Sequence, residues 1–403
     1  MTRYPSSSVG MRQTKILLLA TIVLLAVFLS GCPFGAAQVT GGWSGTAFRD
    51  GTIYAGTLQG AVVAINATTR SPQWPDPHRV TIPAEGLQCG PAAVAAPLYA
   101  TPTVVGDVVY IGTYAGEVLA LNTVARSQGL PFPQRGAGEW VEFLDGQAGN
   151  NAVVADLAVR DDLLYVSASD GRVYCLSRAF GDFVARSEVV DHRHRKLWTS
   201  PVIHNEAVYV STFEGHIRAL SADTLELLDW SFEADAGFAS SPVIHDDILY
   251  VGSFDNQLYA VRIGDSDPLW TFRGGQWFWA SPVVHEEVVY AACLDGRVYA
   301  IGAETGVELG RFNSGSPIVS SPVLMDDSLI VANEQGVVDV FDLSGGPESL
   351  EVPFRSITIG DKVRSSFSAH DGFVAIRGED NHLYVVDIDE GRVVWDVPLD
   401  IEE

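Results

Sequence analysis

The feature that most restricts the fold is an internal repeat of about 40 residues. Four segments begin with the same Ser-Pro-Val triplet, at Ser200, Ser241, Ser281 and Ser321, with spacings of 41, 40 and 40 residues. Each unit holds β-branched and aromatic residues in strand-like patterns. Residues 248–253 and 258–261, for example, indicate two strands joined by a tight turn. A period near 40 built from strands is typical of the blade of a β-propeller rather than of a helical solenoid.

The turn between these two strands recurs through the whole chain and gives the number of repeats. Its residue pairs are Gln59-Gly60, Ala115-Gly116, Asp170-Gly171, Glu214-Gly215, Asp255-Asn256, Asp295-Gly296, Gln335-Gly336 and Asp380-Asn381. Tight hairpin turns favour such pairs because both central positions need positive φ. We therefore expect an all-β fold, an eight-bladed β-propeller of four-stranded antiparallel blades. The blades should fold as one domain over residues 43–403, since a lone blade cannot bury both of its apolar faces.

Composition supports a large globular body and excludes several other classes. Hydrophobic residues make up 47% and charged residues 19% of the 403 positions, which excludes intrinsic disorder. With 25 Lys+Arg against 50 Asp+Glu, the net charge is −25, and nucleic acid is not expected as a partner. The four cysteines form no C-x-x-C pair, which excludes a zinc ribbon, a thioredoxin-type motif and a disulfide scaffold.

Residues 1–31 have the features of a secretory signal. Arg12 and Lys15 precede the apolar run 16–28, which is shorter than the about 20 residues needed to span a bilayer. Leu29-Ser30-Gly31-Cys32 resembles the lipobox of bacterial lipoproteins. This resemblance implies cleavage before Cys32, lipid attachment to it, and a lipidated tether over 32–42. The alternative is an ordinary signal peptide with an incidental cysteine. Met11 as the start would give a more typical signal length.

The repeat unit S-P-V, V-Y-V-G-S, x-G-x-L-Y-A-L-D and T-G-x-x-x-W resembles that of the PQQ-binding-like β-propellers. That family's tryptophan-docking pattern is matched best by residues 385–395, and alanine and tryptophan keep their spacing at 260–270 and 64–74. The family includes the quinoprotein alcohol dehydrogenases and the propeller lipoprotein of the outer-membrane β-barrel assembly machinery. WD repeats have an overlapping period, but no unit combines their Gly-His and Trp-Asp marks in register.

The resemblance leaves an enzyme and a binding scaffold open. The quinoprotein enzymes carry adjacent cysteines beside the cofactor, together with a carboxylate base and calcium ligands. No two cysteines are adjacent here: Cys175 and Cys293 fall in strand patterns, where buried thiols are expected, and Cys89 lies in a loop. We therefore expect no catalytic residue, no cofactor and no bound metal. A quinoprotein dehydrogenase with pyrroloquinoline quinone (PQQ) and Ca²⁺ is the alternative.

Two polar features recur near the first hairpin turn of each unit. His204, His245 and His285 occupy the same place in consecutive blades. We interpret them as turn residues, because equivalent atoms in adjacent blades lie too far apart for zinc–nitrogen bonds of about 2.0–2.1 Å. Every first turn also contains an acid, at Asp50, Asp107, Asp161, Glu206, Asp246, Glu286, Asp326 and Asp371, several of them doubled. Asp favours turns, but the doubled acids predict an acidic face that attracts a cationic partner or divalent ions.

The aromatic run Trp277-Phe278-Trp279 is the main candidate for a binding site. Phe278 aligns with Phe238 and Ile318 and is expected in the core. Trp277 and Trp279 show no counterpart in the repeat, which leaves two roles open, packing between blades and anchoring a partner. Long loops at about 75–98, 123–151 and 177–196, the last with the basic cluster 191–196, decorate the first three blades.

The predicted function is that of a scaffold rather than of an enzyme. We expect an exported lipoprotein, anchored through Cys32, that faces the periplasm or the cell exterior and binds an unidentified protein partner. The family resemblance implies a role in envelope or outer-membrane protein assembly. A surface propeller that binds or senses a ligand is the alternative.

Overall fold

The computed structural model describes residues 42–75, 77–83, 93–144, 151–194, 196–238 and 240–399. The predicted signal, Cys32, the tether before Gly42 and Cys89 lie outside these residues. The chain divides into a larger compact unit, Thr40–Ile82 with Ala95–Glu403, and a smaller one, Met1–Val39 with Pro83–Val94. The larger unit contains the propeller. Strands β5 (Thr81–Pro83) and β6 (Ala93–Ala95) form a separate two-stranded sheet.

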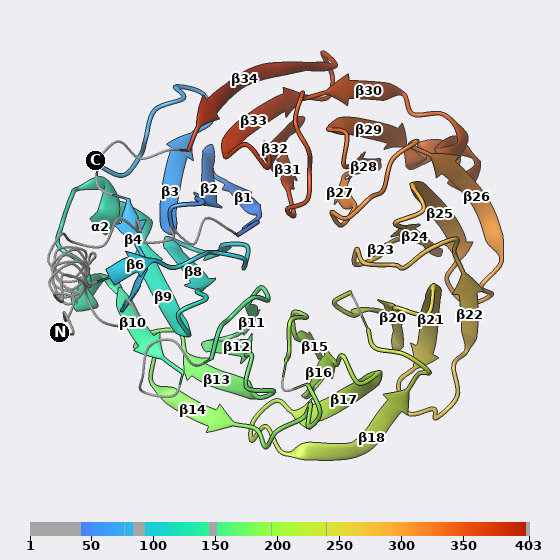
Figure 1. Ribbon diagram of the computed structural model, residues 1–403, viewed down its shortest axis with the longest axis horizontal. Coiled ribbons are helices and arrows are strands. Elements are labelled where there is room, and N and C mark those ends of the chain that lie inside the picture. The colour runs from blue at the N-terminus through green and yellow to red at the C-terminus, as the bar shows by residue number, and fades with distance from the viewer. Residues whose placement is uncertain are drawn as a thin grey trace, which may run out of the picture. The chain divides into compact units, whose positions relative to one another are not determined.

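Eight four-stranded antiparallel sheets follow one another around a central axis, which confirms the predicted propeller (Figure 1). Blades 1 to 4 consist of β1 (Thr46–Arg49), β2 (Thr52–Gly56), β3 (Ala61–Asn66), β4 (His78–Arg79); β7 (Thr103–Val105), β8 (Val108–Gly112), β9 (Glu117–Asn122), β10 (Trp140–Phe143); β11 (Ala158–Arg160), β12 (Leu163–Ser167), β13 (Val173–Ser177), β14 (Phe183–Arg186); and β15 (Val202–His204), β16 (Ala207–Ser211), β17 (His216–Ser221), β18 (Leu227–Glu233). Blades 5 to 8 consist of β19 (Val243–His245), β20 (Ile248–Gly252), β21 (Gln257–Arg262), β22 (Trp270–Arg273); β23 (Val283–His285), β24 (Val288–Ala292), β25 (Arg297–Gly302), β26 (Glu308–Asn313); β27 (Val323–Met325), β28 (Ser328–Ala332), β29 (Val337–Asp342), β30 (Arg355–Thr358); and β31 (Ser368–His370), β32 (Phe373–Arg377), β33 (His382–Asp387), β34 (Arg392–Pro398).

Helical structure among the described residues is confined to short connections. They are α2 (Thr123–Ser127) and η1 (Arg135–Ala137) before β10, and η2 (Leu343–Gly345) and η3 (Pro347–Glu351) before β30. Within the described ranges, no helix has the length and apolar character that crossing a bilayer requires. The assignment of 75–98, 123–151 and 177–196 to loops is wrong in part, because β4, β10 and β14 lie there. Outermost strands such as β14 are largely exposed, so the sequence lacks the apolar alternation that marks a strand.

The predicted turns join the second and third strands of each blade, but only one of their two positions has positive φ. The second residue of every pair does, from 64° at Asn381 to 90° at Gly215, and the first does not. The loop is longer than a two-residue hairpin. In blade 6 the Gly296 N–H donates to the Cys293 carbonyl at 3.1 Å, and the Cys293 N–H donates to the Arg297 carbonyl at 2.9 Å. Gly or Asn is therefore needed once per turn, where the backbone turns left-handed.

The Ser-Pro-Val triplet links neighbouring blades through a series of hydrogen bonds that we call the serine ladder. Each serine Oγ accepts from the backbone N–H at the same position of the preceding blade. The donors and acceptors are Asp156 to Ser200 at 3.1 Å, Ser200 to Ser241 at 2.8 Å, Ser241 to Ser281 at 3.0 Å and Ser281 to Ser321 at 3.0 Å. In blade 3, Asp156 replaces serine, and its Oδ1 accepts from the Thr101 N–H at 2.6 Å. The repeated triplet is thus explained by contacts between blades.

Removing one hydrogen bond of the serine ladder should lower the stability of the protein only modestly. Ser241→Ala deletes one acceptor for the half-buried Ser200 N–H, and we expect the free energy of unfolding to fall by about 1 kcal/mol. Urea unfolding followed by circular dichroism measures this change. Ser241→Thr is the matched control because it keeps the hydroxyl, and threonine holds this position in blade 2 at Thr101. Equal losses in the two variants would contradict the role of the oxygen.

Tryptophans near the outer edge of the blades bind to the next blade. The indole Nε1 atoms of Trp140, Trp230, Trp270 and Trp395 donate to the carbonyls of Arg178, Asp265, Ala303 and Ala67 at 2.8, 2.8, 2.8 and 3.0 Å. This is the docking that the family pattern at 260–270 and 385–395 implies. Trp74 is also buried, but its ring packs on Tyr54 with 5.8 Å between centroids.

The ring closes by packing between two complete blades rather than by sharing a strand, since blade 1 uses β1–β4 and blade 8 uses β31–β34. Ile53 and Ile65 of blade 1 share a core cluster with Val385 and Trp395 of blade 8. Thr46 Oγ1 donates to the Ala375 carbonyl at 2.6 Å. At the ladder position, Gly45 leaves room for no side chain: a Cβ there would lie 2.6 Å from Thr101 Oγ1 and 2.7 Å from the Ser366 carbonyl oxygen.

Arg377 ties the first described residues to this seam. Its side chain is 3% exposed, and its guanidinium donates to the Gly42 carbonyl at 3.1 Å. Burial lowers the pKa of Arg377 to about 10, so the group stays charged at neutral pH. Gly42 is thereby fixed beside blade 8.

The two described cysteines are buried free thiols, as expected. Burial raises the pKa of Cys175 to about 11 and that of Cys293 to about 12. Because the thiolate is the reactive form, we expect neither to react with Ellman's reagent at pH 8 until urea unfolds the protein. The assay uses a variant in which Cys32 and Cys89 are replaced by serine. Rapid labelling of the native protein would show that the structure around Cys175 or Cys293 opens.

Candidate functional site: an aromatic crown at the channel mouth

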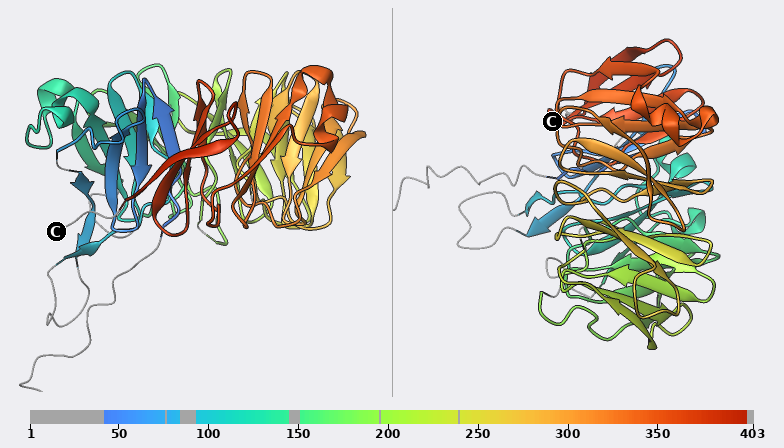
Figure 2. Two further views of the ribbon diagram at one scale, coloured as in Figure 1. Left: turned by 90° about the horizontal axis from the view of Figure 1, so that it is seen from above. Right: turned by 90° about the vertical axis from the view of Figure 1, so that its right-hand side faces the viewer.

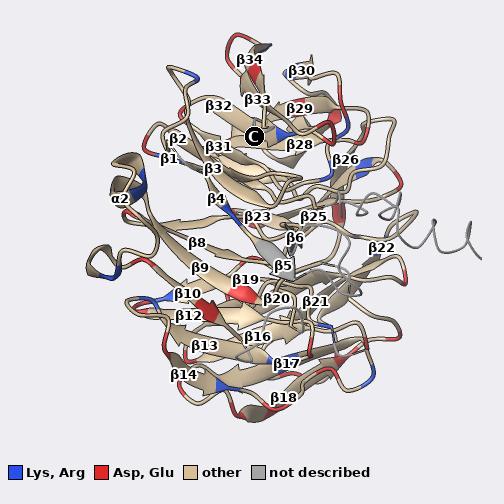
Figure 3. Ribbon diagram, turned by 60° about the vertical axis from the view of Figure 1, so that its left-hand side comes forward, with Lys and Arg blue, Asp and Glu red and all other residues tan. Residues whose placement is uncertain are grey.

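The propeller has two faces that differ in chemistry. The turns between the first and second strands lie on one face, which we call the acidic face. The turns between the second and third strands and the links between blades lie on the other, the mouth face (Figure 2, left). The acids predicted in the eight first turns therefore share one face, and Figure 3 marks acidic residues in many turns at blade edges. Attraction of cations to this face stays a prediction.

The three repeated histidines end strands β15, β19 and β23, one residue before the turns to which the sequence assigned them. They pair with acids and do not converge on one another. His204 Nε2 lies 2.6 Å from Asp247 Oδ1 of the next blade, and His285 Nε2 lies 3.5 Å from Asp327 Oδ1 of the next. His245 Nε2 lies 3.6 Å from Asp246 Oδ2 of its own blade. Its ligand atoms lie within 4.8 Å of those of Asp246 and of Glu287 in the next blade, with His245 half-buried and both acids exposed. Two of the three histidines therefore pair with an acid across a blade boundary.

Eight aromatic side chains on the mouth face form what we call the aromatic crown. Its members are Trp43, Tyr99, Tyr114, Trp198, Phe213, Phe254, Trp277 and Trp279. They pack in two arcs. Trp43 lies 4.9 Å from Tyr99, and Tyr99 lies 5.4 Å from Tyr114, measured between ring centroids. The second arc runs from Trp198 through Phe213 and Phe254 to Trp277 and Trp279, with centroid separations of 5.4, 5.7, 5.1 and 5.9 Å.

The crown is open to solvent although it is built from large apolar rings. Trp43 is 51% exposed, Trp277 is 42% exposed and Trp198 is 38% exposed. Lys196 Nζ, from the basic cluster, lies over the Trp198 ring at 5.1 Å from its centroid. Trp277 and Trp279 pack against Phe254, and Trp277 keeps 42% of its area exposed, so both roles considered for these two residues stay open.

Part of the crown follows the repeat. Trp43, Tyr99, Trp198 and Trp279 each lie two residues before the serine-ladder position of their blade. The expectation that Trp279 has no counterpart is therefore wrong. Comparing this position in all eight blades, including those without the Ser-Pro-Val triplet, would have found the four aromatic residues. Trp277, one of the two predicted anchors, has no aromatic equivalent. Phe278 is buried in the core, as expected.

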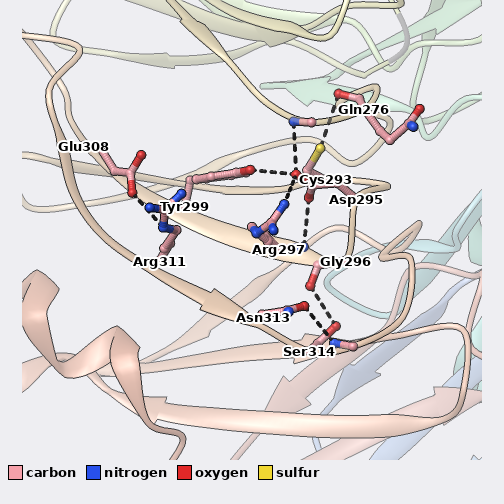
Figure 4. A network of polar contacts seen from close by, with 12 residues as sticks. Gln276, Cys293, Asp295, Gly296, Arg297, Tyr299, Glu308, Arg311, Asn313 and Ser314 are labelled. Atoms are coloured by element: carbon pink, nitrogen blue, oxygen red, sulfur yellow. Dashed lines mark hydrogen bonds and ion pairs between the residues drawn. The ribbon is translucent and has the colours of Figure 1, made fainter.

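The loop that carries Trp277 and Trp279 is held by Asp295, in the turn between β24 and β25 (Figure 4). Asp295 Oδ2 accepts from the Gly275 N–H at 3.0 Å and from the Tyr299 hydroxyl at 2.6 Å, and Oδ1 accepts from the Arg297 N–H at 2.9 Å. Burial raises the pKa of Asp295, but these hydrogen bonds outweigh burial and hold the pKa below its usual value. A charged carboxylate thus fixes the loop.

An apolar hollow of about 530 Å³ lies inside the crown. It is lined by Trp43, Gln276, Trp277, Trp279, Leu294, Pro317, Val319, Glu334 and Arg364. The charges at its edge are paired: Arg364 Nε lies 2.7 Å from Glu334 Oε1, and Arg364 Nη1 lies 3.3 Å from Glu379 Oε1. The hollow can accept an apolar or aromatic side chain while its rim stays polar, which is the arrangement of a protein-binding hot spot.

The channel mouth is a second hollow, of about 380 Å³. It is lined by Trp43, Tyr99, Trp198 and Trp279, by the serines of the ladder and by Asp156. Burial raises the pKa of Asp156, and the hydrogen bonds from Thr101 oppose this rise. Sequence reasoning missed Asp156, although it is the acid at a position that otherwise carries Ser, Thr or Gly.

Comparison with known proteins identifies the family. A family model described as outer membrane protein assembly factor BamB matches residues 35–272, 230–355 and 294–402. No curated protein matches the chain. The computationally designed Ika8 protein is 15% identical, with a TM-score of 0.64 over 88% of this chain and 98% of its own. BamB from Moraxella catarrhalis is 17% identical, with a TM-score of 0.61 over 87% of this chain and 95% of its own. At these identities the two structures support the propeller fold alone. The family model covers nearly the whole sequence, and the chain belongs to the PQQ-like propeller family that this model describes.

Proposed function

We propose that this protein is a protein-binding scaffold of the cell envelope, exported and held at a membrane by a lipid on Cys32. The description of its family, which names an outer membrane protein assembly factor, supports a role in envelope protein assembly. The lipobox-like sequence 29–32 after an apolar run supports the anchor. The scaffold would act by presenting a rigid surface to a partner protein rather than by chemistry.

The aromatic crown is the observation that carries this proposal. Large aromatic rings supply most of the binding energy at protein interfaces, where they cluster in water-excluding pockets. Here they remain 38–51% exposed at Trp43, Trp198 and Trp277, beside a hollow of about 530 Å³. An exposed aromatic patch of this kind is unfavourable in water unless a partner covers it. The crown therefore supports protein binding better than catalysis.

The test replaces the two predicted anchors. Trp277→Ala with Trp279→Ala should weaken partner binding by a factor of about 30 or more, because hot-spot residues contribute at least about 2 kcal/mol. A photo-cross-linker at Gln276 identifies the partner in cells, and the level of correctly assembled outer-membrane β-barrel proteins gives the functional readout. Leu227→Ala with Leu228→Ala is the matched control, since these side chains are 45% and 44% exposed on β18, outside the crown. Equal behaviour of the two double variants would refute the proposal.

The anchor has its own test. Cys32→Ser should move the protein from the membrane fraction to the soluble exported fraction and leave its thermal unfolding unchanged. Metabolic labelling with a fatty acid should mark the wild-type chain and not the variant. Membrane retention of an unlabelled variant would instead favour an uncleaved signal.

A quinoprotein enzyme is the second candidate. PQQ carries three carboxylates, and Ca²⁺ takes about 6–8 oxygen ligands. Among the described residues that line the channel mouth, Arg364 supplies the only guanidinium group and Asp156 the only carboxylate. Arg364 is already paired with Glu334 and Glu379. This donor set fits the cofactor poorly. Titration with PQQ and Ca²⁺ by calorimetry should therefore give no binding at high micromolar concentration, and stoichiometric binding would make a dehydrogenase the better proposal.

A further inference from the structure

Asp156 brings a negative charge to a place where the fold requires only a hydrogen-bond acceptor. The serine ladder is built from neutral hydroxyl oxygens at Ser200, Ser241, Ser281 and Ser321. Asp156 takes the same place in blade 3, and its Oδ1 makes the corresponding bond to the Thr101 N–H at 2.6 Å. A serine would supply that acceptor without charge. The hydrogen bonding of the serine ladder therefore does not require the negative charge of Asp156.

The surroundings of Asp156 would suit a cation. The same hollow is lined by Tyr99, Trp198 and Trp279, and aromatic rings attract ammonium and guanidinium groups. Arg364 also lines this hollow, but it is bound by Glu334 and Glu379. Within the described part of the chain, Asp156 has hydrogen bonds from Thr101 and no ion pair.

We propose that the channel mouth is a receptor for a lysine or arginine side chain presented by the partner protein, with Asp156 as its counter-ion and the crown rings around its stem. The assignment rests on the proposed scaffold function and adds the chemistry of the partner segment. A polypeptide segment fits better than a free amine because the neighbouring apolar hollow, which shares Trp43 and Trp279 with the mouth, would bind an adjacent side chain of the same segment.

The energetics are consistent with this assignment. Burial raises the pKa of Asp156, which means that its charged form is costly without a cation beside it. A basic side chain would remove that cost and gain a charge-assisted hydrogen bond. The net charge of −25 would also steer a basic segment toward the protein, more strongly at low salt.

Two synthetic peptides test the proposal on the full-length lipidated protein in detergent. One is acetyl-Gly-Phe-Ser-Arg-Ser-Gly-amide, and the other replaces arginine with citrulline, which has nearly the same shape but no charge. Tryptophan fluorescence and calorimetry report binding. We expect the arginine peptide to bind the wild type at least about tenfold more tightly, as a charge-assisted hydrogen bond predicts. Asp156→Ser, which restores the ladder residue, should abolish this difference and leave thermal unfolding unchanged.

Asp246→Asn is the matched control, because it also removes one negative charge but lies in a turn of the acidic face. It should keep the discrimination between the peptides. Equal affinity of the wild type for both peptides, or unchanged discrimination in Asp156→Ser, would overturn the proposal. So would methylguanidinium binding as tightly as the arginine peptide, since the ligand would then be a free cation. The Trp277/Trp279 double variant separates a failure of this proposal from a failure of the scaffold function. If the scaffold function were wrong, this variant would still capture the partner protein, while the wild type would still bind the arginine peptide more tightly than the citrulline peptide.

Discussion

Trp395→Ala should lower the free energy of unfolding by about 3–5 kcal/mol, the range for truncating a buried aromatic residue to alanine. Trp395 is 6% exposed and shares a core cluster with Ile53 and Ile65 across the seam between blades 1 and 8. Its Nε1 donates to the Ala67 carbonyl at 3.0 Å. Because no strand is shared across this seam, packing of this kind carries the closure of the ring. Urea unfolding followed by circular dichroism measures the loss.

Trp277→Ala is the control for this prediction, because the same ring is removed from a site that is 42% exposed. Its cost should stay below about 1 kcal/mol, in keeping with the small effects of surface substitutions. Comparable losses in the two variants would mean that the seam contributes no more to stability than the crown does. Size-exclusion chromatography of Trp395→Ala would show whether an opened ring associates.

Asp295→Asn should lower the free energy of unfolding by about 3 kcal/mol at pH 7, since it weakens charge-assisted hydrogen bonds from four donor groups to a buried carboxylate. The donors are the Tyr299 hydroxyl, the Arg297 guanidinium and the backbone N–H groups of Gly275 and Arg297. The amide cannot accept at both of its terminal atoms, so at least one donor loses its partner. The loop with Trp277 should loosen as well, which tryptophan fluorescence detects.

The same variant predicts a pH dependence with a definite sign. The folded protein holds the pKa of Asp295 below its usual value, because hydrogen bonds to the carboxylate outweigh burial. The contribution of ionised Asp295 to the free energy of unfolding is therefore complete above the pKa of this group in the unfolded chain, about 3.9. It is lost as the pH falls through the lower pKa of Asp295 in the folded protein. The difference between wild type and Asp295→Asn should shrink on acidification in that window. Asp246→Asn, at a turn where Asn tolerates the positive φ of 47°, should show almost no difference at any pH.

Much of the fold could be predicted from the sequence because short sequence motifs mark each repeat. The Ser-Pro-Val triplets, the turn pairs and the docking pattern at 385–395 each recur at fixed spacing. Each motif involves residues close together in the sequence, because each blade is one continuous segment of the chain. The short outer strands β4, β10 and β14 were missed, because they span only two, four and four residues, too few for an alternating apolar pattern to be recognised. The turn type was also misjudged: one positive φ per turn suffices when hydrogen bonds within the loop complete it.

The candidate site could be predicted only in part. Trp277 and Trp279 were found because two tryptophans beside a repeat boundary stand out. Their neighbours Trp43, Tyr99 and Trp198 come from other blades, and nothing in a linear reading indicates that ring contacts such as Phe254 to Trp277 at 5.1 Å will form. Asp156 lies in a degenerate repeat where the triplet is hard to recognise. Its role at a ladder position becomes visible only when the Thr101 N–H is seen to donate to it.

The sequence by itself determined the all-β class, the number of blades, the acidic balance and the burial of Cys175 and Cys293, because these depend on local spacing and composition. Only the tertiary structure decided how the ring closes, which face carries the acids and which carries the aromatic crown, and that Asp156 lines the channel mouth. The physical reason is that a closed ring brings together one position from every blade, so residues some 40 to 300 positions apart, such as Trp43 and Trp279, share one hollow.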